Sequence, residues 1–135
     1  MPLLSRKGIL AIAAVIDVAI HAHGRPVSAK ALAARHKLPP RHLEPVLQAL
    51  VRDGILKGVR GPHGGYDLAR ERKRITADDI LRATGSAEEE GEPPLPSAFV
   101  NDVVRPALAE AERAFATALG RINIDDLAKQ ASTHK

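Results

Sequence analysis

The sequence predicts a mainly α-helical domain with one small β-hairpin. Three observations support this fold class. Apolar residues recur at helical spacing in several segments, two short helical segments meet at a brief turn, and a run of glycines with one proline then separates two β-prone pieces. Two helices joined by a turn and followed by a hairpin form the layout of a winged helix-turn-helix domain.

A first helix is predicted over residues 5–22, with Ser5 as its N-cap and Gly24 as its stop. Four isoleucines mark the face that we expect to pack on the core: Ile9, Ile12, Ile16 and Ile20. Arg6 and Lys7 lie in the first turn, where the helix dipole disfavours cations. A nearby DNA phosphate would explain them, and so would a basic terminus without any ligand.

The helix-turn-helix segment begins at Ser28, the N-cap of a short helix over 29–36. Residues 37–40 form a break, and a second helix over 41–53 ends at Gly54. Its buried stripe is Leu43, Val46, Leu47 and Leu50, and its opposite face carries Arg41, Glu44, Pro45 and Gln48. A recognition helix of this kind places its first side chains on base edges, so Arg41 could read guanine and Glu44 cytosine. Alternatively, Glu44 only complements the helix dipole and Arg41.

Pro45 conflicts with an ideal helix at this position. It removes one backbone hydrogen bond and crowds the carbonyl of Arg41, so we expect the first turn to be kinked or loosely wound.

The hairpin covers residues 56–69, with β-prone pieces at 56–60 and 66–69. Glycines supply the positive φ that tight turns need, and Pro62 fixes one corner. We interpret the hairpin as the wing of a DNA-binding domain, with Arg60 and His63 beside bare backbone. A hairpin that only caps the core is the alternative.

The second half of the chain has three predicted parts. Thr76 and Asp79 resemble a capping box for a short helix over 77–84, which completes a DNA-binding domain at 1–84. Residues 85–97 form an acidic, Pro- and Gly-rich linker. Residues 98–135 follow as a dimerisation region, with a long helix over 98–119 and a short one over 124–131. Pro106 must lie near the start of the long helix or kink it. The apolar seam of the long helix has heptad-like spacing and consists of Val104, Leu108, Ala111, Phe115, Ala118 and Ile122.

The charge and composition agree with a protein that presents one face to a polyanion. Residues 1–74 carry 14 Lys and Arg against 5 Asp and Glu, whereas residues 75–135 carry 6 against 11. The absence of cysteine excludes disulfides and thiol chemistry, and no segment has the length of a membrane span or the pattern of a signal peptide. We therefore expect a cytoplasmic protein.

Catalytic and metal sites have no good candidates. No Ser, His and Asp set or phosphate-cradling loop is apparent, so we expect no enzyme activity. His21 and His23 are two positions apart and do not share a helical face, which argues against a metal role. Asp17, amid apolar neighbours, is interpreted as a structural polar residue.

Several stretches resemble the Rrf2 family of bacterial winged-helix regulators across nearly the whole chain. They are Ser5-Arg6-Lys7-Gly8, the helix with Asp17, Pro26-Val27-Ser28, His42-Leu43-Glu44, Gly54-Ile55-Leu56, the wing from Val59 to Ala69, Ile75-Thr76 with Asp79-Ile80-Leu81, and Ile122-Asn123-Ile124-Asp125-Asp126-Leu127. The wing is the most specific of them. The resemblance implies a homodimer on a palindromic operator, with Glu44 in the major groove and Arg60 in the minor groove.

The expected DNA contacts combine the residue pattern with this resemblance: Lys7, Ser28, Pro40, Arg41, His42, Glu44, Gln48, Arg60, Gly61, His63, Gly64, Gly65 and Tyr66. Two departures from the family matter. Members that bind an iron–sulfur cluster have three cysteines where this chain has its acidic linker, and Pro45 stands where a polar residue often contacts DNA.

The function predicted from the sequence is a homodimeric repressor that binds double-stranded DNA without a cofactor. Its effector, if it has one, would be a small molecule or a protein. The alternative is a protein-interaction module that binds a partner enzyme and retains only residual DNA affinity. The salt dependence of duplex binding separates the two.

Overall fold

A computed structural model describes residues 5–84 and 97–133 of the chain. Its elements, in order, are α1 (Arg6–His21), α2 (Ala29–His36), α3 (Pro40–Arg52), β1 (Leu56–Val59), β2 (Gly65–Leu68), the 3₁₀ helix η1 (Arg72–Arg74), α4 (Ala77–Thr84), the π-helical segment η2 (Val100–Val104), α5 (Arg105–Gly120) and α6 (Ile124–Thr133). The predicted fold class, mainly α-helical with one small antiparallel hairpin, is confirmed.

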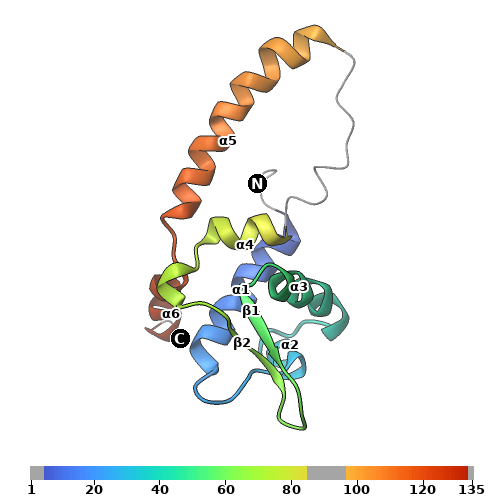
Figure 1. The fold of residues 1–135 in the computed structure, drawn as a ribbon, viewed down its shortest axis with the longest axis vertical. Helices are drawn as coiled ribbons and strands as arrows, with labels where there is room; N and C mark the ends of the chain where they lie inside the picture. The colour runs from blue at the N-terminus through green and yellow to red at the C-terminus, as the bar shows by residue number, and fades with distance from the viewer. Residues whose placement is uncertain (1–4, 85–96, 134–135) are drawn as a thin grey trace.

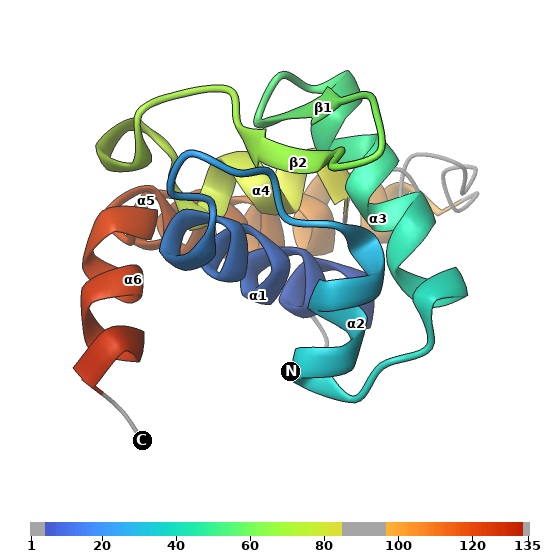
Figure 2. The same cartoon turned by 90° about the horizontal axis from the view of Figure 1, so that it is seen from below.

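Helix α1 is the central element of the body. It packs against α3, α4 and α6, and β2 lies against it as well (Figures 1 and 2). The largest fully buried side chains come from all parts of the domain: Leu32, Leu43, Leu47, Leu50, Ile55, Leu56, Ile75, Ile80, Ile124, Val15 and Val18. All of them are aliphatic, as expected for a chain with few aromatic residues. Burial of each such side chain stabilises the fold by about 1.5–3 kcal/mol.

The predicted core face of α1 is wrong in part. Ile12, Ile16 and Ile20 are only half-buried at the margin of the core, and Ile9 is 55% exposed. The fully buried positions are instead Ala11, Ala14, Val15 and Val18. Because α1 is apolar on most sides, spacing alone does not select a face, and small residues allow closer helix packing. Gly8 is one of these, since a Cβ there would collide with Leu81 of α4.

The predicted helix starts are confirmed by their hydrogen bonds. The Ser5 hydroxyl accepts from the Gly8 amide at 2.9 Å, and the Ser28 hydroxyl accepts from the Ala31 amide at 3.0 Å. Thr76 and Asp79 form the expected capping box, each side chain accepting from the other residue's amide at 3.2 Å. These caps satisfy amides that a helix cannot pair internally.

The hairpin is joined to the body by an isolated β-bridge at Val27. β1 and β2 pair antiparallel, from Leu56 opposite Leu68 to Val59 opposite Gly65. Two backbone hydrogen bonds of 2.8 and 2.7 Å join Val27 to Tyr66. They connect β2 to the segment that directly precedes α2. The wing therefore keeps a fixed position relative to the helix-turn-helix segment.

The C-terminal part leaves the body and then returns to it. η2 and α5 form one long helical rod, which contacts α4 and has no buried residue within α5 (Figure 1). α6 then rejoins the core through Ile124, whose amide donates to the carbonyl of Ile75 at 2.8 Å. Most of the predicted linker, residues 85–96, lies outside the described residues.

Within the described parts of the chain, none of the helices combines the length and the apolar character needed to cross a bilayer.

Candidate DNA-binding site

Helix α3 has the amphipathic character expected of a recognition helix. Its predicted buried stripe of Leu43, Val46, Leu47 and Leu50 is confirmed. The predicted contact residues on the other side are all exposed: Pro40, Arg41, His42, Glu44 and Gln48. Pro40 begins the helix, where a missing amide hydrogen costs nothing, and the helix continues through Pro45 to Arg52.

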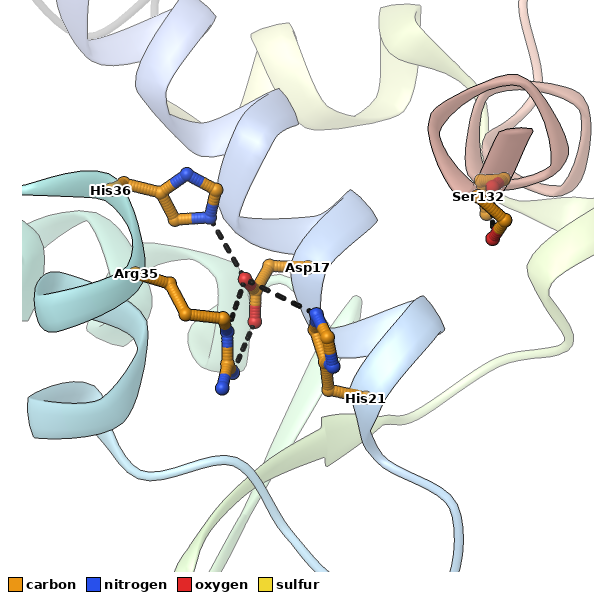
Figure 3. Close-up of polar contacts among 6 residues, drawn as sticks. Asp17, His21, Arg35, His36 and Ser132 are labelled. Carbon is orange, nitrogen blue, oxygen red and sulfur yellow. Dashed lines mark hydrogen bonds and ion pairs between the residues drawn. The ribbon is translucent and has the colours of Figure 1, made fainter. Parts of the chain in front are cut away.

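A buried carboxylate holds α2 against α1 and thereby sets the position of the helix-turn-helix. Asp17 of α1 accepts two hydrogen bonds from Arg35, from Nε at 2.9 Å and from Nη2 at 2.7 Å (Figure 3). His36 Nε2 lies 2.8 Å from the same carboxylate, and His21 Nε2 lies 4.0 Å away. The side chain of Asp17 is only 2% exposed. We call these four residues the Asp17 cluster.

The cluster keeps Asp17 ionised. Burial alone would raise the pKa of its carboxyl group, but the hydrogen bonds from Arg35 and His36 outweigh that effect and hold the pKa below its usual value. Since α2 and α3 pack on each other, a charge pair between α1 and α2 also supports the recognition helix. The expectation that Asp17 is a satisfied structural residue is confirmed.

The wing presents its predicted contacts in two different settings. Arg60, Gly61 and His63 are exposed near the tip, whereas Gly64, Gly65 and Tyr66 are half-buried. The second group has a structural reason for its residue types. A Cβ on Gly64 would collide with the carbonyl oxygen of Val59, and one on Gly65 would collide with Val27.

A hollow of about 350 Å³ lies between the wing and α2. It brings together three predicted contacts, Ser28, His63 and Gly64. It also includes three basic residues that sequence reasoning did not assign to DNA, namely His21, Arg25 and Arg35. A basic residue directly before the extended Pro26-Val27-Ser28 was the signal available for Arg25. We call this the wing–α2 hollow.

A larger cleft of about 660 Å³ lies between the first turns of α1 and α3. It brings together the predicted contacts Lys7, Arg41 and His42, with Arg6 beside them. Its apolar lining consists of Ile9, Leu10, Ala13, Leu38 and Pro45. We call this the α1–α3 cleft.

Other predicted contacts lie outside these two sites. Arg60, Gly65 and Tyr66 share a shallow depression of about 270 Å³ on the hairpin. Pro40, Glu44, Gln48 and Gly61 line none of the three hollows and are exposed.

Comparison with known proteins identifies the family. The model of the Rrf2 family, described as an iron-dependent transcriptional regulator, matches residues 4–130. The chain belongs to the Rrf2 family. It is 39% identical over 80 residues to a putative HTH-type transcriptional regulator of Haemophilus influenzae, an alignment that covers 59% of this chain and 53% of that protein. The chain thus spans about half the length of such curated relatives.

Solved structures of other members agree with the observed fold. The IscR of T. potens has a TM-score of 0.75 and 33% identity, and the match covers 95% of this chain and 87% of that one. CymR, the global cysteine regulator of B. subtilis, has a TM-score of 0.72 and 27% identity, covering 94% and 96%. The winged-helix fold is therefore that of the Rrf2 family, whose members are DNA-binding transcriptional regulators and not enzymes.

Proposed function

We propose that this Rrf2-family regulator is a homodimeric repressor that binds a palindromic operator in the cytoplasm. The observation that carries the proposal is the arrangement of exposed polar and basic side chains on three neighbouring elements, the start of α3, the start of α1 and the wing. A winged helix uses such elements together, with the recognition helix in the major groove and flanking contacts on the backbone.

The exposed residues of α3 are proposed to read base edges. Arg41 can donate two hydrogen bonds to guanine, Glu44 can accept from the cytosine amino group, and Gln48 can pair with adenine. Arg60, exposed at the wing, would enter the minor groove, where a narrow groove concentrates negative potential.

The wing–α2 hollow is proposed to hold a backbone phosphate. Arg25 and His63 both line it, and so do Ser28 and Ala31 at the start of α2, where a helix N-terminus favours anions. Phosphate contacts fix the register of a protein on DNA without selecting a sequence. Arg25 would therefore affect affinity for all duplexes alike.

The homodimer is proposed from the surface of η2 and α5. Within the predicted seam, Leu108 is 58% exposed, Ile122 is 40% exposed, and Ala111 and Ala118 are exposed as well. Val104 and Phe115 are half-buried in their own protomer. Phe99 and Val103, at 68% and 56% exposed, extend the apolar surface beyond the predicted seam. A second copy would remove this surface from water and pair two recognition helices about a two-fold axis.

We also propose that this member works without an iron–sulfur cluster, although its family model is described as iron-dependent. Clusters are held mainly by cysteine thiolates, and the 135-residue chain has no cysteine. Among the residues that the structure describes, no group of three His, Asp or Glu side chains is arranged to hold a metal ion. The residues present therefore do not fit a cluster, and a small molecule or a protein would serve as effector.

The salt dependence of binding tests the proposal. Duplexes selected from a random pool by the full-length chain should bind about 10³-fold or more tightly than unselected duplex. A plot of the logarithm of the binding constant against the logarithm of the salt concentration should have a slope that corresponds to several phosphate contacts. Weak binding that does not depend on the duplex sequence would instead favour the protein-interaction alternative.

A further inference from the structure

The α1–α3 cleft has the size and lining of a small-molecule site. Its volume of about 660 Å³ falls within the range of roughly 300–1,000 Å³ that such sites occupy. Ile9 leaves 55% of its surface in water at the edge of this cleft, although it lies on the most buried helix of the domain. A partly apolar ligand would cover Ile9 and its neighbours Leu10 and Leu38. Removal of this apolar surface from water would favour binding of the ligand.

The charge at the cleft is positive. Arg6 and Arg41 line it together with Lys7 and His42, and none of the described residues that line it is acidic. Both α1 and α3 begin here, and neither has an acidic residue in its first turn to offset the positive end of its dipole. The start of α3 also lacks a side-chain cap, because its N-cap residue is Pro39. The apolar lining with a cationic edge therefore matches a molecule with an apolar body and an anionic end.

We propose that the α1–α3 cleft binds an amphipathic carboxylate, such as a fatty acid of medium chain length, and that this ligand weakens DNA binding. The carboxylate suits the arginines because their guanidinium groups can pair with its two oxygens. The coupling rests on the proposed function, in which Lys7, Arg41 and His42 face DNA. A ligand anion and the DNA phosphates would compete for the same cations, so each lowers the affinity of the other.

A second copy of the chain is the other candidate occupant. A partner seated permanently in the cleft would cover Lys7, Arg41 and His42 and would block the face proposed for DNA. The exposed apolar surface of η2 and α5 is available to a partner instead. The cleft is thus left for a reversible ligand.

Calorimetry on the full-length chain without DNA tests the ligand. Decanoate, below its micelle concentration, should bind once per chain with a Kd of about 10–100 µM, in the range that ligand efficiency allows for so small a molecule. Decanol should bind about tenfold more weakly because it lacks the charge, and acetate should not bind measurably because it lacks the apolar chain. Equal affinity for decanol and decanoate would overturn the proposal.

Matched variants locate the site. The side chains of Arg6 and Ile9 both line the cleft, so Arg6→Gln and Ile9→Gln should each weaken decanoate binding about tenfold. Ile9→Leu keeps an apolar side chain there and should retain the binding. Arg52→Gln is the charge-matched control, because Arg52 ends α3 and is exposed away from the cleft. Unchanged affinity in Ile9→Gln, or loss of dimer in that variant by sedimentation, would show that the cleft is not a ligand site and would contradict the proposal.

A second arm measures the coupling. A decanoate concentration that saturates the wild-type protein should reduce its affinity for selected duplex about fivefold and should have a clearly smaller effect on Ile9→Gln. Ligand binding without any effect on duplex affinity would refute the claim that the ligand and DNA compete for the same cations. If no duplex binds specifically, the proposed function fails, whereas the calorimetric result still decides whether the cleft takes a carboxylate.

Discussion

Replacement of Asp17 by asparagine tests how the recognition helix is held in place. The carboxylate of Asp17 is 2% exposed and accepts two hydrogen bonds from Arg35, while His36 lies within hydrogen-bond distance of it. Asparagine has nearly the same volume, so the change removes the charge and one acceptor without leaving a cavity. The amide would also direct donor hydrogens toward Arg35 or His36.

The expected loss of unfolding free energy is about 2–4 kcal/mol. Hydrogen bonds to charged groups contribute about 1.5–3 kcal/mol each, and removal of one member of a fully buried ion pair costs about 3–5 kcal/mol. The lower range applies here because Arg35 and His36 remain 36% and 39% exposed and can be solvated again when the carboxylate is lost. A domain of this size has only about 5–15 kcal/mol in total, so the change should be easy to detect.

Urea unfolding followed by far-ultraviolet circular dichroism measures this loss, since the chain has no tryptophan. Asp53→Asn is the matched control, because it removes the same charge from an exposed residue at the end of α3 and should change stability by less than about 0.5 kcal/mol. Equal unfolding midpoints for the two variants would refute the clamping role of Asp17.

The pH dependence follows from the lowered pKa of Asp17. A carboxyl group with a lower pKa in the folded chain stabilises fully above its unfolded value, near 3.8, and loses this contribution as the pH falls through the folded value. The difference between wild type and Asp17→Asn should therefore narrow as the pH falls below about 4. A difference that does not narrow between about pH 4 and about pH 2 would contradict this assignment.

Three further predictions concern DNA, assembly and metal. Arg60→Ala should cost about 1–3 kcal/mol per half-site in duplex affinity without loss of fold, and unchanged affinity would reject the wing assignment. Leu108→Glu should shift the sedimentation profile toward monomer and weaken binding to a palindrome, because two separate monomers lack the effective-concentration advantage of a dimer on two half-sites. Glu112→Gln on the same helix should change neither property. Anaerobic purification should yield a colourless protein whose duplex affinity does not respond to air, chelators or nitric oxide, and a brown protein with stoichiometric iron and sulfide would refute the absence of a cluster.

Local sequence signals predicted most of the elements. Ser28 and the pair of Thr76 and Asp79 located helix starts because their side chains pair with backbone amides a few residues away. The glycines of the wing were informative for a similar reason, since Gly61 adopts a φ of 119° that other residues avoid. Such signals depend on neighbours in the chain and can be read without the fold.

Features that depend on distant contacts were not predictable in the same way. Two of the partners of Asp17, Arg35 and His36, lie 18 and 19 residues away, and only the fold brings α2 to this carboxylate. The core face of α1 was misjudged because an evenly apolar helix has no periodicity to read. Pro106 was expected either near the start of the long helix or at a kink in it, and it lies in the first turn of α5. The π-helical turn before it was not expected. There the amide of Arg105 donates to the carbonyl of Val100, and the wider turn accommodates the proline that follows.

The contact residues were recognised as a set but not in their grouping. Lys7 and Arg41 lie 34 positions apart, yet both line the α1–α3 cleft, and Ser28 and His63 meet across the wing–α2 hollow. Both sites form between elements, so their hollows, and the inclusion of Arg25, became apparent only in the folded chain.

Selection of bound sequences from a random duplex pool by the full-length protein tests the central claim most directly. A two-fold symmetric dimer should enrich an inverted repeat whose half-site centres are separated by about 10 bp or a multiple of it, so that both recognition helices meet the major groove on one side. Enrichment of a single, unrepeated half-site, or no enrichment at all, would contradict the proposed dimeric operator binding.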